Sequence, residues 1–179
     1  MALGLHGCRS GAGADQLRQK RRQVQDRQYR RRSPAVADQS TAAETFEITH
    51  SEDEWRRLLT PAQFQVLRKH GTERPFTSPL NDEHRTGVFS CAACDLPVYK
   101  SETKFDSGTG WPSFYAPIED AVRTSNDFSL IMRRTEVHCR RCGGHLGHVF
   151  DDGPPPTGKR YCMNGVALKF TPAPPSGPA

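Results

Sequence analysis

Six cysteines are the residues of this 179-residue chain best suited to chemistry, and their spacing divides them into three groups. Four of them form two pairs, Cys91-Ala-Ala-Cys94 and Cys139-Arg-Arg-Cys142. Two residues between thiols let both sulfurs face one metal ion from a tight turn, and a closed tetrahedral zinc site needs two such pairs. Gly143 and Gly144 follow the second pair and suit such a turn. The duplicated spacing therefore predicts one structural zinc ion per chain, held by four thiolates.

Two other interpretations of the paired cysteines remain open. A single CxxC pair is also typical of a redox dithiol, and two pairs can form disulfides in an oxidising compartment. The duplication favours zinc, because a redox site needs only one pair. The pairs are separated by 44 residues, which is longer than in a compact zinc ribbon. The predicted zinc site should therefore tie distant strands together.

The remaining two cysteines differ in their surroundings. Cys8 lies in the N-terminal segment, where an incidental exposed thiol is the simplest interpretation. Cys162 lies in Arg160-Tyr161-Cys162-Met163-Asn164, between turn residues and an apolar strand. A lone cysteine in a strand is more often a small buried apolar residue than a reactive thiol. The neighbours of Cys162 must therefore decide its role.

Two short helices are expected at the start of the folded region. Ser51 with Glu54 and Thr60 with Gln63 have the spacing of capping boxes. Pro61 suits the first position of the second helix, and Gly71 is expected to end it. The apolar residues of the two helices should face a core: Trp55, Leu58, Leu59, Phe64 and Leu67.

After Gly71 the pattern changes to short β-type runs between Gly, Pro, Asn and Asp. This alternation predicts a mainly β domain with an antiparallel sheet and tight turns. The expected strands include residues 88–90, 98–99, 128–132, 136–137, 148–150 and 166–170.

The positive charge of the chain is concentrated at its N-terminus. Residues 1–40 hold eight Arg and one Lys against three Asp, a balance of +6, whereas residues 41–179 have a balance of −1. Residues 1–44 hold few large apolar residues and are expected to form a disordered basic extension, with an organelle transit peptide as the alternative. The folded domain is expected at 45–171, followed by a flexible Pro-rich tail at 172–179. No stretch approaches the length of a membrane span.

Several motifs in register resemble the methionine-R-sulfoxide reductase family, type B. The resemblance runs from about Ser51 to Phe170 and includes both CxxC pairs. Its other motifs are Gly71-Thr72-Glu73-Arg74-Pro75-Phe76, Ser107-Gly108-Thr109-Gly110-Trp111-Pro112-Ser113-Phe114, His145-Leu146-Gly147-His148-Val149-Phe150 and Arg160-Tyr161-Cys162-Met163-Asn164.

The resemblance implies two antiparallel sheets with short N-terminal helices and a four-cysteine zinc site. It implies an enzyme that repairs oxidative damage by reducing methionine-R-sulfoxide, free or in proteins. Attack of the Cys162 thiolate on the sulfoxide sulfur would leave a sulfenic acid. By motif position, His145, His148 and Asn164 would surround the sulfoxide and Arg160 would support the cysteine. Trp111 and Asp152 would complete the substrate site.

The chain departs from the family pattern at Thr109 and at Gly165. Many members carry a resolving cysteine at the first position and a serine at the second. Without that cysteine, an external thiol such as thioredoxin is the expected reductant of the sulfenic acid. Attack by Cys8 or by a zinc-bound cysteine remains an alternative.

Each site residue also has a simpler interpretation. His145 and His148 have the spacing of a metal-binding pair, although four cysteines already satisfy one zinc. Trp111 fits a core position, and Asp151 and Asp152 fit a turn before Gly153.

A zinc-ribbon module that binds nucleic acid is the rival function. It accounts for the four cysteines and for the run Arg30, Arg31 and Arg32, but not for Cys162. It also needs a basic face, which the charge of the domain does not supply. We therefore expect no nucleic-acid partner. We also expect no membrane association and a monomer. Reduced thiols suit the cytoplasm, or an organelle matrix if residues 1–40 are a transit peptide.

Overall fold

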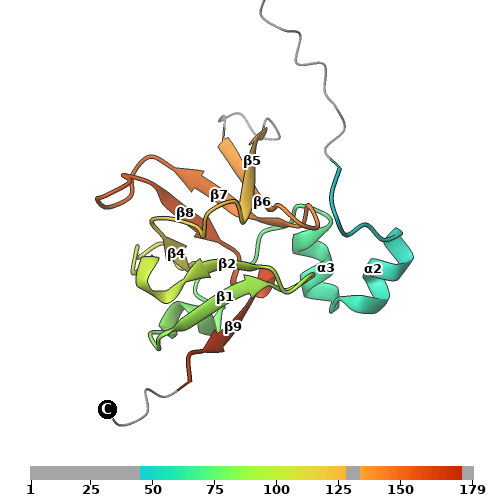
Figure 1. The fold of residues 1–179 in the computed structure, drawn as a ribbon, viewed down its shortest axis with the longest axis horizontal. Coiled ribbons are helices and arrows are strands. Elements are labelled where there is room, and N and C mark those ends of the chain that lie inside the picture. The colour runs from blue at the N-terminus through green and yellow to red at the C-terminus, as the bar shows by residue number, and fades with distance from the viewer. Residues whose placement is uncertain (1–44, 128–133, 175–179) are drawn as a thin grey trace, which may run out of the picture. The chain divides into compact units, whose positions relative to one another are not determined.

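The computed structural model describes residues 45–127 and 134–174 (Figure 1). The predicted basic extension at 1–44, with Cys8, lies outside the described residues, and so do the predicted strand at 128–132 and most of the Pro-rich tail. The domain boundaries therefore stay a prediction.

Both predicted helices form, and both capping boxes are confirmed. Helix α2 spans Glu52–Leu58 and helix α3 spans Pro61–Leu67. The Glu54 N–H donates to the Ser51 hydroxyl at 3.3 Å, and the Ser51 N–H donates to the Glu54 carboxylate at 2.8 Å. Thr60 and Gln63 make the same reciprocal pair. These bonds satisfy the amide groups that a helix start leaves free.

The apolar face of α2 differs from the prediction at one residue. Trp55 and Leu59 are buried, but Leu58 is 62% exposed. Leu59 follows the helix with an extended backbone, which returns its side chain to the core and leaves Leu58 at the outer edge. The predicted apolar face is therefore wrong for Leu58 alone, since Phe64 and Leu67 of α3 are buried.

The end of α3 also differs from the prediction. The helix ends at Leu67, and the residue in the left-handed region is His70, with a φ of 55°. The Gly71 N–H donates to the Gln65 carbonyl at 3.0 Å, and a Cβ on Gly71 would lie 2.8 Å from that oxygen. Glycine is needed here for close approach of the backbone, whereas His70 makes the turn.

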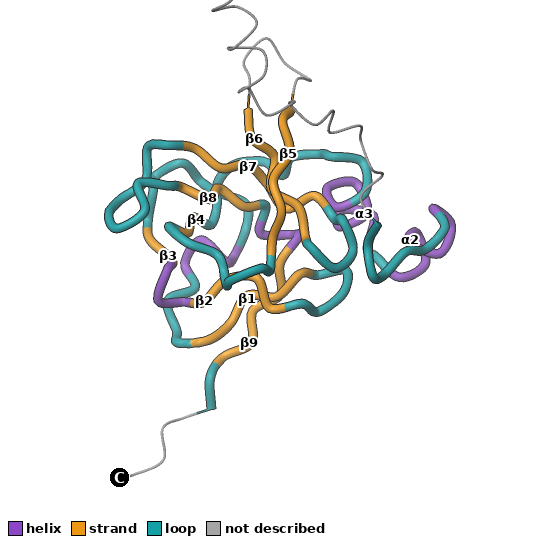
Figure 2. The backbone as a smooth tube through the Cα atoms, turned by 45° about the horizontal axis from the view of Figure 1, so that its top comes forward, coloured by secondary structure: helices purple, strands orange, loops and turns teal. Residues whose placement is uncertain are grey.

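Two antiparallel sheets form the domain, as the resemblance implied (Figure 2). The first has the order β2-β1-β9, with β1 at Gly87–Cys91, β2 at Pro97–Lys100 and β9 at Leu168–Pro172. The second has the order β3-β4-β8-β7-β6-β5. Its strands are β3 (Lys104–Phe105), β4 (Ser113–Phe114), β5 (Val122–Asp127), β6 (Arg134–Cys139), β7 (His145–Phe150) and β8 (Arg160–Met163).

Three short 3₁₀ helices lie between these elements: η1 (Pro79–Asp82), η2 (Ser101–Thr103) and η3 (Gly165–Ala167). The strand predicted at 166–170 therefore begins only at Leu168, because Val166 and Ala167 belong to η3. Strand β5 was not predicted. Its residues 123–126 are polar and exposed at the edge of the sheet, so they show no apolar alternation.

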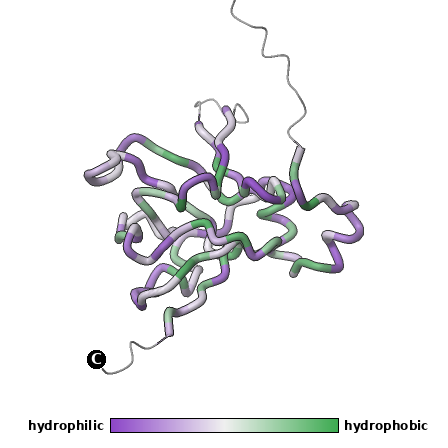
Figure 3. Tube along the Cα trace, in the orientation of Figure 1, coloured by the Kyte–Doolittle hydropathy of each residue, from purple (hydrophilic) through white to green (hydrophobic). Residues whose placement is uncertain are grey.

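Aromatic residues from both sheets form the core that holds β8 in place. The Tyr99 ring stacks on Phe114 at 4.3 Å between centroids, and Phe89 meets Phe114 edge-on at 5.0 Å. The Tyr99 hydroxyl donates to the sulfur of Met163 at 3.1 Å. Met163 is fully buried next to Cys162, so the core fixes the strand that carries the lone cysteine. Figure 3 colours the backbone by hydropathy and shows apolar segments interspersed with hydrophilic ones along the chain. In the described part of the chain, no helix has the length and apolar character needed to span a membrane.

Candidate active site and metal centre

The four paired cysteines converge on one point. Their sulfur atoms all lie within 4.8 Å of one another. Cys91 Sγ lies 3.7 Å from Cys142 Sγ, and Cys94 Sγ lies 3.5 Å from Cys139 Sγ. A tetrahedral site with Zn–S bonds of about 2.3 Å places its sulfurs about 3.8 Å apart, whereas a disulfide would bring two of them to about 2.05 Å. The geometry therefore fits four ligands on one metal ion.

The backbone forms the same kind of turn around each cysteine pair. In the first turn the Asp95 N–H donates to the Cys91 carbonyl, and in the second the Gly143 N–H donates to the Cys139 carbonyl, both at 2.9 Å. Asp95 and Gly143 both have positive φ, at 58° and 67°. The turn predicted from Gly143 is thus confirmed. Asp95 occupies the equivalent position in the turn of the first pair.

The cysteine site joins the two sheets. Cys91 is the last residue of β1 in the three-stranded sheet, and Cys139 is the last residue of β6 in the six-stranded sheet. A metal ion held by these four cysteines would therefore tie the two sheets together, as the long spacing predicted.

Cys162 lies apart from these four cysteines, at a small cavity of about 110 Å³. Three adjacent strands set its position, because Cys162 of β8 is paired with Ser113 of β4 and with His148 of β7. Trp111 and Phe150 supply apolar surface. The full lining is Thr72, Trp111, Arg134, Gly147, His148, Phe150, Cys162 and Asn164. The cavity thus brings together four of the expected site residues, which are Cys162, Trp111, His148 and Asn164.

Opposing influences act on the Cys162 thiol. Burial raises its pKa, while the Thr109 hydroxyl and the Arg160 guanidinium lower it without cancelling the effect of burial. The net pKa is above the ordinary value, so the unliganded site holds a thiol more than a thiolate.

Arg160 and Asp152 form a bidentate ion pair at the edge of the site. The Arg160 Nε and one terminal nitrogen donate to the two Asp152 oxygens at 2.9 and 2.8 Å. The guanidinium also lies over the Phe150 ring at 4.5 Å. Asp152 does not line the cavity around Cys162. Its carboxylate orients Arg160, which in turn lowers the pKa of Cys162.

The loop that follows α3 is bound to two residues of the site through Glu73. The Trp111 indole N–H donates to the Glu73 carbonyl at 3.1 Å, and the Glu73 N–H donates to the Asn164 side-chain oxygen at 2.9 Å. The Asn164 amide nitrogen donates to the Leu146 carbonyl at 3.1 Å. Both halves of the Asn164 amide are therefore committed to holding the loop against β7.

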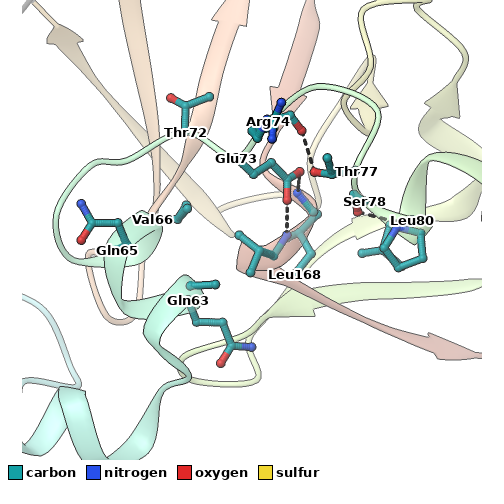
Figure 4. Close-up of a pocket in the computed structure, with 14 residues that line it drawn as sticks. Gln63, Gln65, Val66, Thr72, Glu73, Arg74, Thr77, Ser78, Leu80 and Leu168 are labelled. Carbon is teal, nitrogen blue, oxygen red and sulfur yellow. Dashed lines mark hydrogen bonds between the residues drawn. The ribbon is translucent and has the colours of Figure 1, made fainter.

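The Glu73 side chain also caps η3, which directly follows Asn164. Its carboxylate accepts hydrogen bonds from the N–H groups of Gly165 and Val166, the latter at 3.0 Å (Figure 4). A second cavity of about 660 Å³ lies along this carboxylate, between α3, the loop 72–80 and η3, and holds none of the cysteines. Sequence reasoning assigned Glu73 no role. The only indication of a role for Glu73 in the sequence was its position within the motif Gly71 to Phe76.

Gly165 is one of the two departures from the family pattern, and the structure explains how it is accommodated. A Cβ at Gly165 would overlap the Ser78 hydroxyl oxygen. Ser78 is itself buried and its hydroxyl accepts the Leu80 N–H at 3.2 Å. Ser78 thus fills the space that a side chain at position 165 would need.

Thr109, the other departure, contacts Cys162 directly. Its hydroxyl oxygen lies 3.9 Å from Cys162 Sγ. Ser107 holds it there, with its own hydroxyl 2.8 Å from Thr109 and 2.7 Å from Ser113. A side chain at this position reaches Cys162, but a threonine cannot form a disulfide.

His145 lies behind the cavity, not on its lining. It is buried, and its Nδ1 lies 2.7 Å from the Glu136 carboxylate. Its ring meets the ring of His148 edge-on at 5.3 Å. Sequence reasoning missed Glu136, because a single glutamate in a strand gives no motif. The pairing of β6 with β7 creates this contact.

Comparisons with known proteins match the chain to one family. Residues 59–172 match the SelR domain family model. A peptide methionine sulfoxide reductase MsrB of Pseudomonas putida (strain W619) is 61% identical over 121 residues, covering 67% of this chain and 91% of that protein. The MsrB of Methanosarcina barkeri (strain Fusaro / DSM 804) is 57% identical over 124 residues, covering 69% and 87%. The MsrB of Agrobacterium fabrum (strain C58 / ATCC 33970) is 53% identical over 126 residues, covering 70% and 93%.

Proposed function

The chain belongs to the SelR domain family and is a methionine sulfoxide reductase, and from that premise we propose that it reduces the R epimer with Cys162 as nucleophile. The observation that carries the proposal is the cavity in which Cys162, Trp111 and His148 meet. A cavity of this size admits a methyl sulfoxide group, and the Trp111 ring offers its methyl an apolar, sulfur-compatible surface.

The first step transfers oxygen from substrate to enzyme. The Cys162 sulfur attacks the sulfoxide sulfur, the S–O bond of the substrate breaks, and the oxygen ends on Cys162 as a sulfenic acid. The thiol proton ends on that oxygen, and two electrons pass from Cys162 to the substrate sulfur. Methionine leaves, and the atoms balance without a further reactant.

This step needs Cys162 deprotonated and the leaving oxygen protonated. Cys162 reacts as the thiolate, although burial favours its thiol. The oxygen must be protonated as it leaves. The His148 imidazole on the cavity lining can accept the thiol proton and return it to the oxygen. Arg160, held by Asp152, stabilises the thiolate meanwhile.

The second step consumes the sulfenic acid. A thiol of an external reductant attacks the Cys162 sulfur, forms a mixed disulfide and releases water. A second thiol of the same reductant then displaces Cys162. Thioredoxin, a dithiol protein, has this chemistry. Thr109 supports this route, because the side chain that contacts Cys162 is not a thiol.

The four-cysteine site is proposed to hold one structural zinc ion. Four thiolates at these distances suit zinc and leave no open position for catalysis. The ion would join the two sheets, and the protein is proposed to act as a monomer in a thiol-reducing compartment such as the cytoplasm.

One experiment tests the proposed reaction. The purified protein is incubated with dithiothreitol and the separated R and S epimers of a methionine sulfoxide derivative, beside Cys162→Ser. We expect loss of the R epimer only, and only with the wild type. Equal loss of both epimers, or activity in Cys162→Ser, would refute the proposal.

A further inference from the structure

Phe76 is an aromatic residue that the fold leaves at the surface beside the active site. Its side chain is 72% exposed, and in the described part of the chain Leu58 is the other exposed large apolar residue. Phe76 also has a φ of 62°, a left-handed conformation that is uncommon for a bulky residue and costs stability. Because the ring is exposed, its burial offsets little of this cost. The conformation therefore points to a role for the ring in function.

Two hydrogen bonds tie the loop that carries Phe76 to the residue before Trp111. The Phe76 N–H and the Asn81 side-chain amide both donate to the Gly110 carbonyl, at 2.7 and 3.1 Å. The Phe76 ring also lies close to Gly110, because a Cβ at Gly110 would come within 2.9 Å of two ring atoms. Phe76 is thus held against the residue that precedes Trp111, the proposed contact for the substrate methyl group.

Trp111 lines two cavities. One is the cavity of about 110 Å³ around Cys162, and the other has about 220 Å³ and is also lined by Phe76. Sites that enclose a whole small molecule measure roughly 300 Å³ or more, so the cavity around Cys162 holds the end of one side chain only. The backbone of a peptide substrate and its neighbouring side chains must therefore lie outside it, and the second cavity can receive one of them.

We propose that Phe76 is a specificity-determining residue, whose ring contacts an apolar side chain next to the oxidised methionine of a polypeptide substrate. Contact between the exposed ring and an apolar side chain removes both from water, which favours binding. Free methionine sulfoxide has no neighbouring residue and cannot use this contact. The inference rests on the proposed function and extends it from the sulfoxide group to the residues beside it.

The cavity of about 660 Å³ is the alternative place for the rest of the substrate. It meets the cavity around Cys162 at Thr72, which lines both. Its aliphatic side chains are already buried or half-buried, whereas the Phe76 ring is largely exposed. These side chains are Val66, Leu80, Val166 and Leu168. Phe76 therefore offers more apolar surface that a substrate can remove from water.

The test is a single turnover of the full chain without external reductant, so that only substrate binding and oxygen transfer contribute. The substrates are R-sulfoxides of N-acetylmethionine and of two acetylated, amidated tripeptides, which carry either alanine or leucine on both sides of the methionine. The dependence of the rate on substrate concentration gives the apparent dissociation constant and the maximum rate. The wild type should bind the leucine peptide more tightly than the alanine peptide.

We expect Phe76→Ala to weaken binding of the leucine peptide about 10-fold, the order of a lost apolar side-chain contact. The preference over the alanine peptide should largely disappear, and the maximum rate should change much less than the dissociation constant. Phe76→Gly should show the same loss, although glycine accepts a φ of 62° without strain. Phe76→Tyr keeps the ring and should retain most of the preference.

Leu58→Ala is the matched control, because Leu58 is also exposed but lines neither of the two cavities that Trp111 lines. It should keep the preference of the wild type. Because the Phe76 ring is exposed, removing it takes little from the core, and Phe76→Gly also relieves the strained backbone.

An unchanged preference for leucine in Phe76→Ala and Phe76→Gly, in a wild type that reduces the R epimer, would overturn this inference and leave the proposed function intact. A wild type that binds the two peptides equally would overturn it as well. So would a defect confined to steady-state turnover and seen as a raised KM for thioredoxin, because the ring would then contact the reductant and not the substrate.

Discussion

The hydroxyl oxygen of Thr109 lies 3.9 Å from the sulfur of Cys162. This contact affects the proposed nucleophile, because the Thr109 hydroxyl lowers the Cys162 pKa against the opposing effect of burial. A thiol in place of the Thr109 hydroxyl would lie close enough to Cys162 to attack it.

Replacing Thr109 by valine should make Cys162 less reactive. The change removes the hydroxyl and keeps the branched shape, so the pKa of Cys162 should rise further above its ordinary value. At neutral pH the thiolate fraction falls, and iodoacetamide should alkylate Cys162 several-fold more slowly. Thr109→Ser keeps the hydroxyl and should react at nearly the wild-type rate. Faster alkylation of Thr109→Val would contradict this role.

Replacing Thr109 by cysteine should change the recycling step. The new thiol would lie next to Cys162 and attack its sulfenic acid, forming a disulfide and releasing water. After one turnover without reductant, mass spectrometry should find the two residues linked, whereas the wild type should keep a sulfenic acid that dimedone traps. A dimedone adduct of equal yield in both proteins would show that position 109 cannot resolve Cys162.

Removing one ligand of the four-cysteine site should unfold the protein. Cys94 is the least buried of the four, so Cys94→Ser changes packing least. Metal analysis should find about one zinc per wild-type chain and much less in the variant. Since metal binding contributes on the order of 10 kcal/mol to folding, thermal unfolding should move to far lower temperature. Cys162→Ser is the matched control and should retain zinc and stability.

The parts of the fold that were predictable are those whose signals are local. Capping boxes and CxxC pairs depend on residues three positions apart, and both formed as expected. Leu58 and β5 were misjudged because burial at a helix end and at a sheet edge depends on the neighbouring elements. The active-site motifs identified Cys162, Trp111, His148 and Asn164, which do line one cavity.

Contacts between segments far apart in the chain could not be predicted from the sequence. The Glu73 carboxylate meets Gly165 across 92 residues, and His70 meets Glu136 across 66. The register of β6 against β7, which shifts between Val137 and His138, sets where Glu136 lies relative to His145. A single sequence carries no signal for such a shift, because one residue of slip changes which side chains share a face.

Gly165 and Ser78 share one space, so we expect substitutions at the two positions to have coupled effects on stability. Gly165→Ser alone should destabilise the protein by about 1–3 kcal/mol, because its Cβ overlaps the Ser78 hydroxyl. Ser78→Gly should empty that space, so the double variant should recover much of the loss. Urea unfolding of the four proteins gives the coupling energy, which should be about 1 kcal/mol or more. Additive losses would show that the two positions do not share one space.

Glu136 predicts a specific dependence of stability on acid. Its pKa is lowered from 4.5 to about 2, first by the hydrogen bond from His145 and then by the charges of His145 and His70 and by Ser125, while burial opposes the shift. A group whose pKa is lower in the folded state stabilises the fold above its unfolded pKa. This contribution should be complete above about pH 4.5 and disappear as the pH falls toward about 2.

Glu136→Gln should therefore have a lower free energy of unfolding than the wild type near neutrality, and the two should converge in acid. Urea unfolding at a series of acidic pH values measures both curves. Glu52→Gln is the control. Its pKa is also lowered, by Lys69 and Arg56, but it lies at the surface, where an ion pair adds little stability. Its curve should follow the wild type throughout. A constant gap between wild type and Glu136→Gln at all pH values would mean that the substitution acts through packing and not through the charge of Glu136.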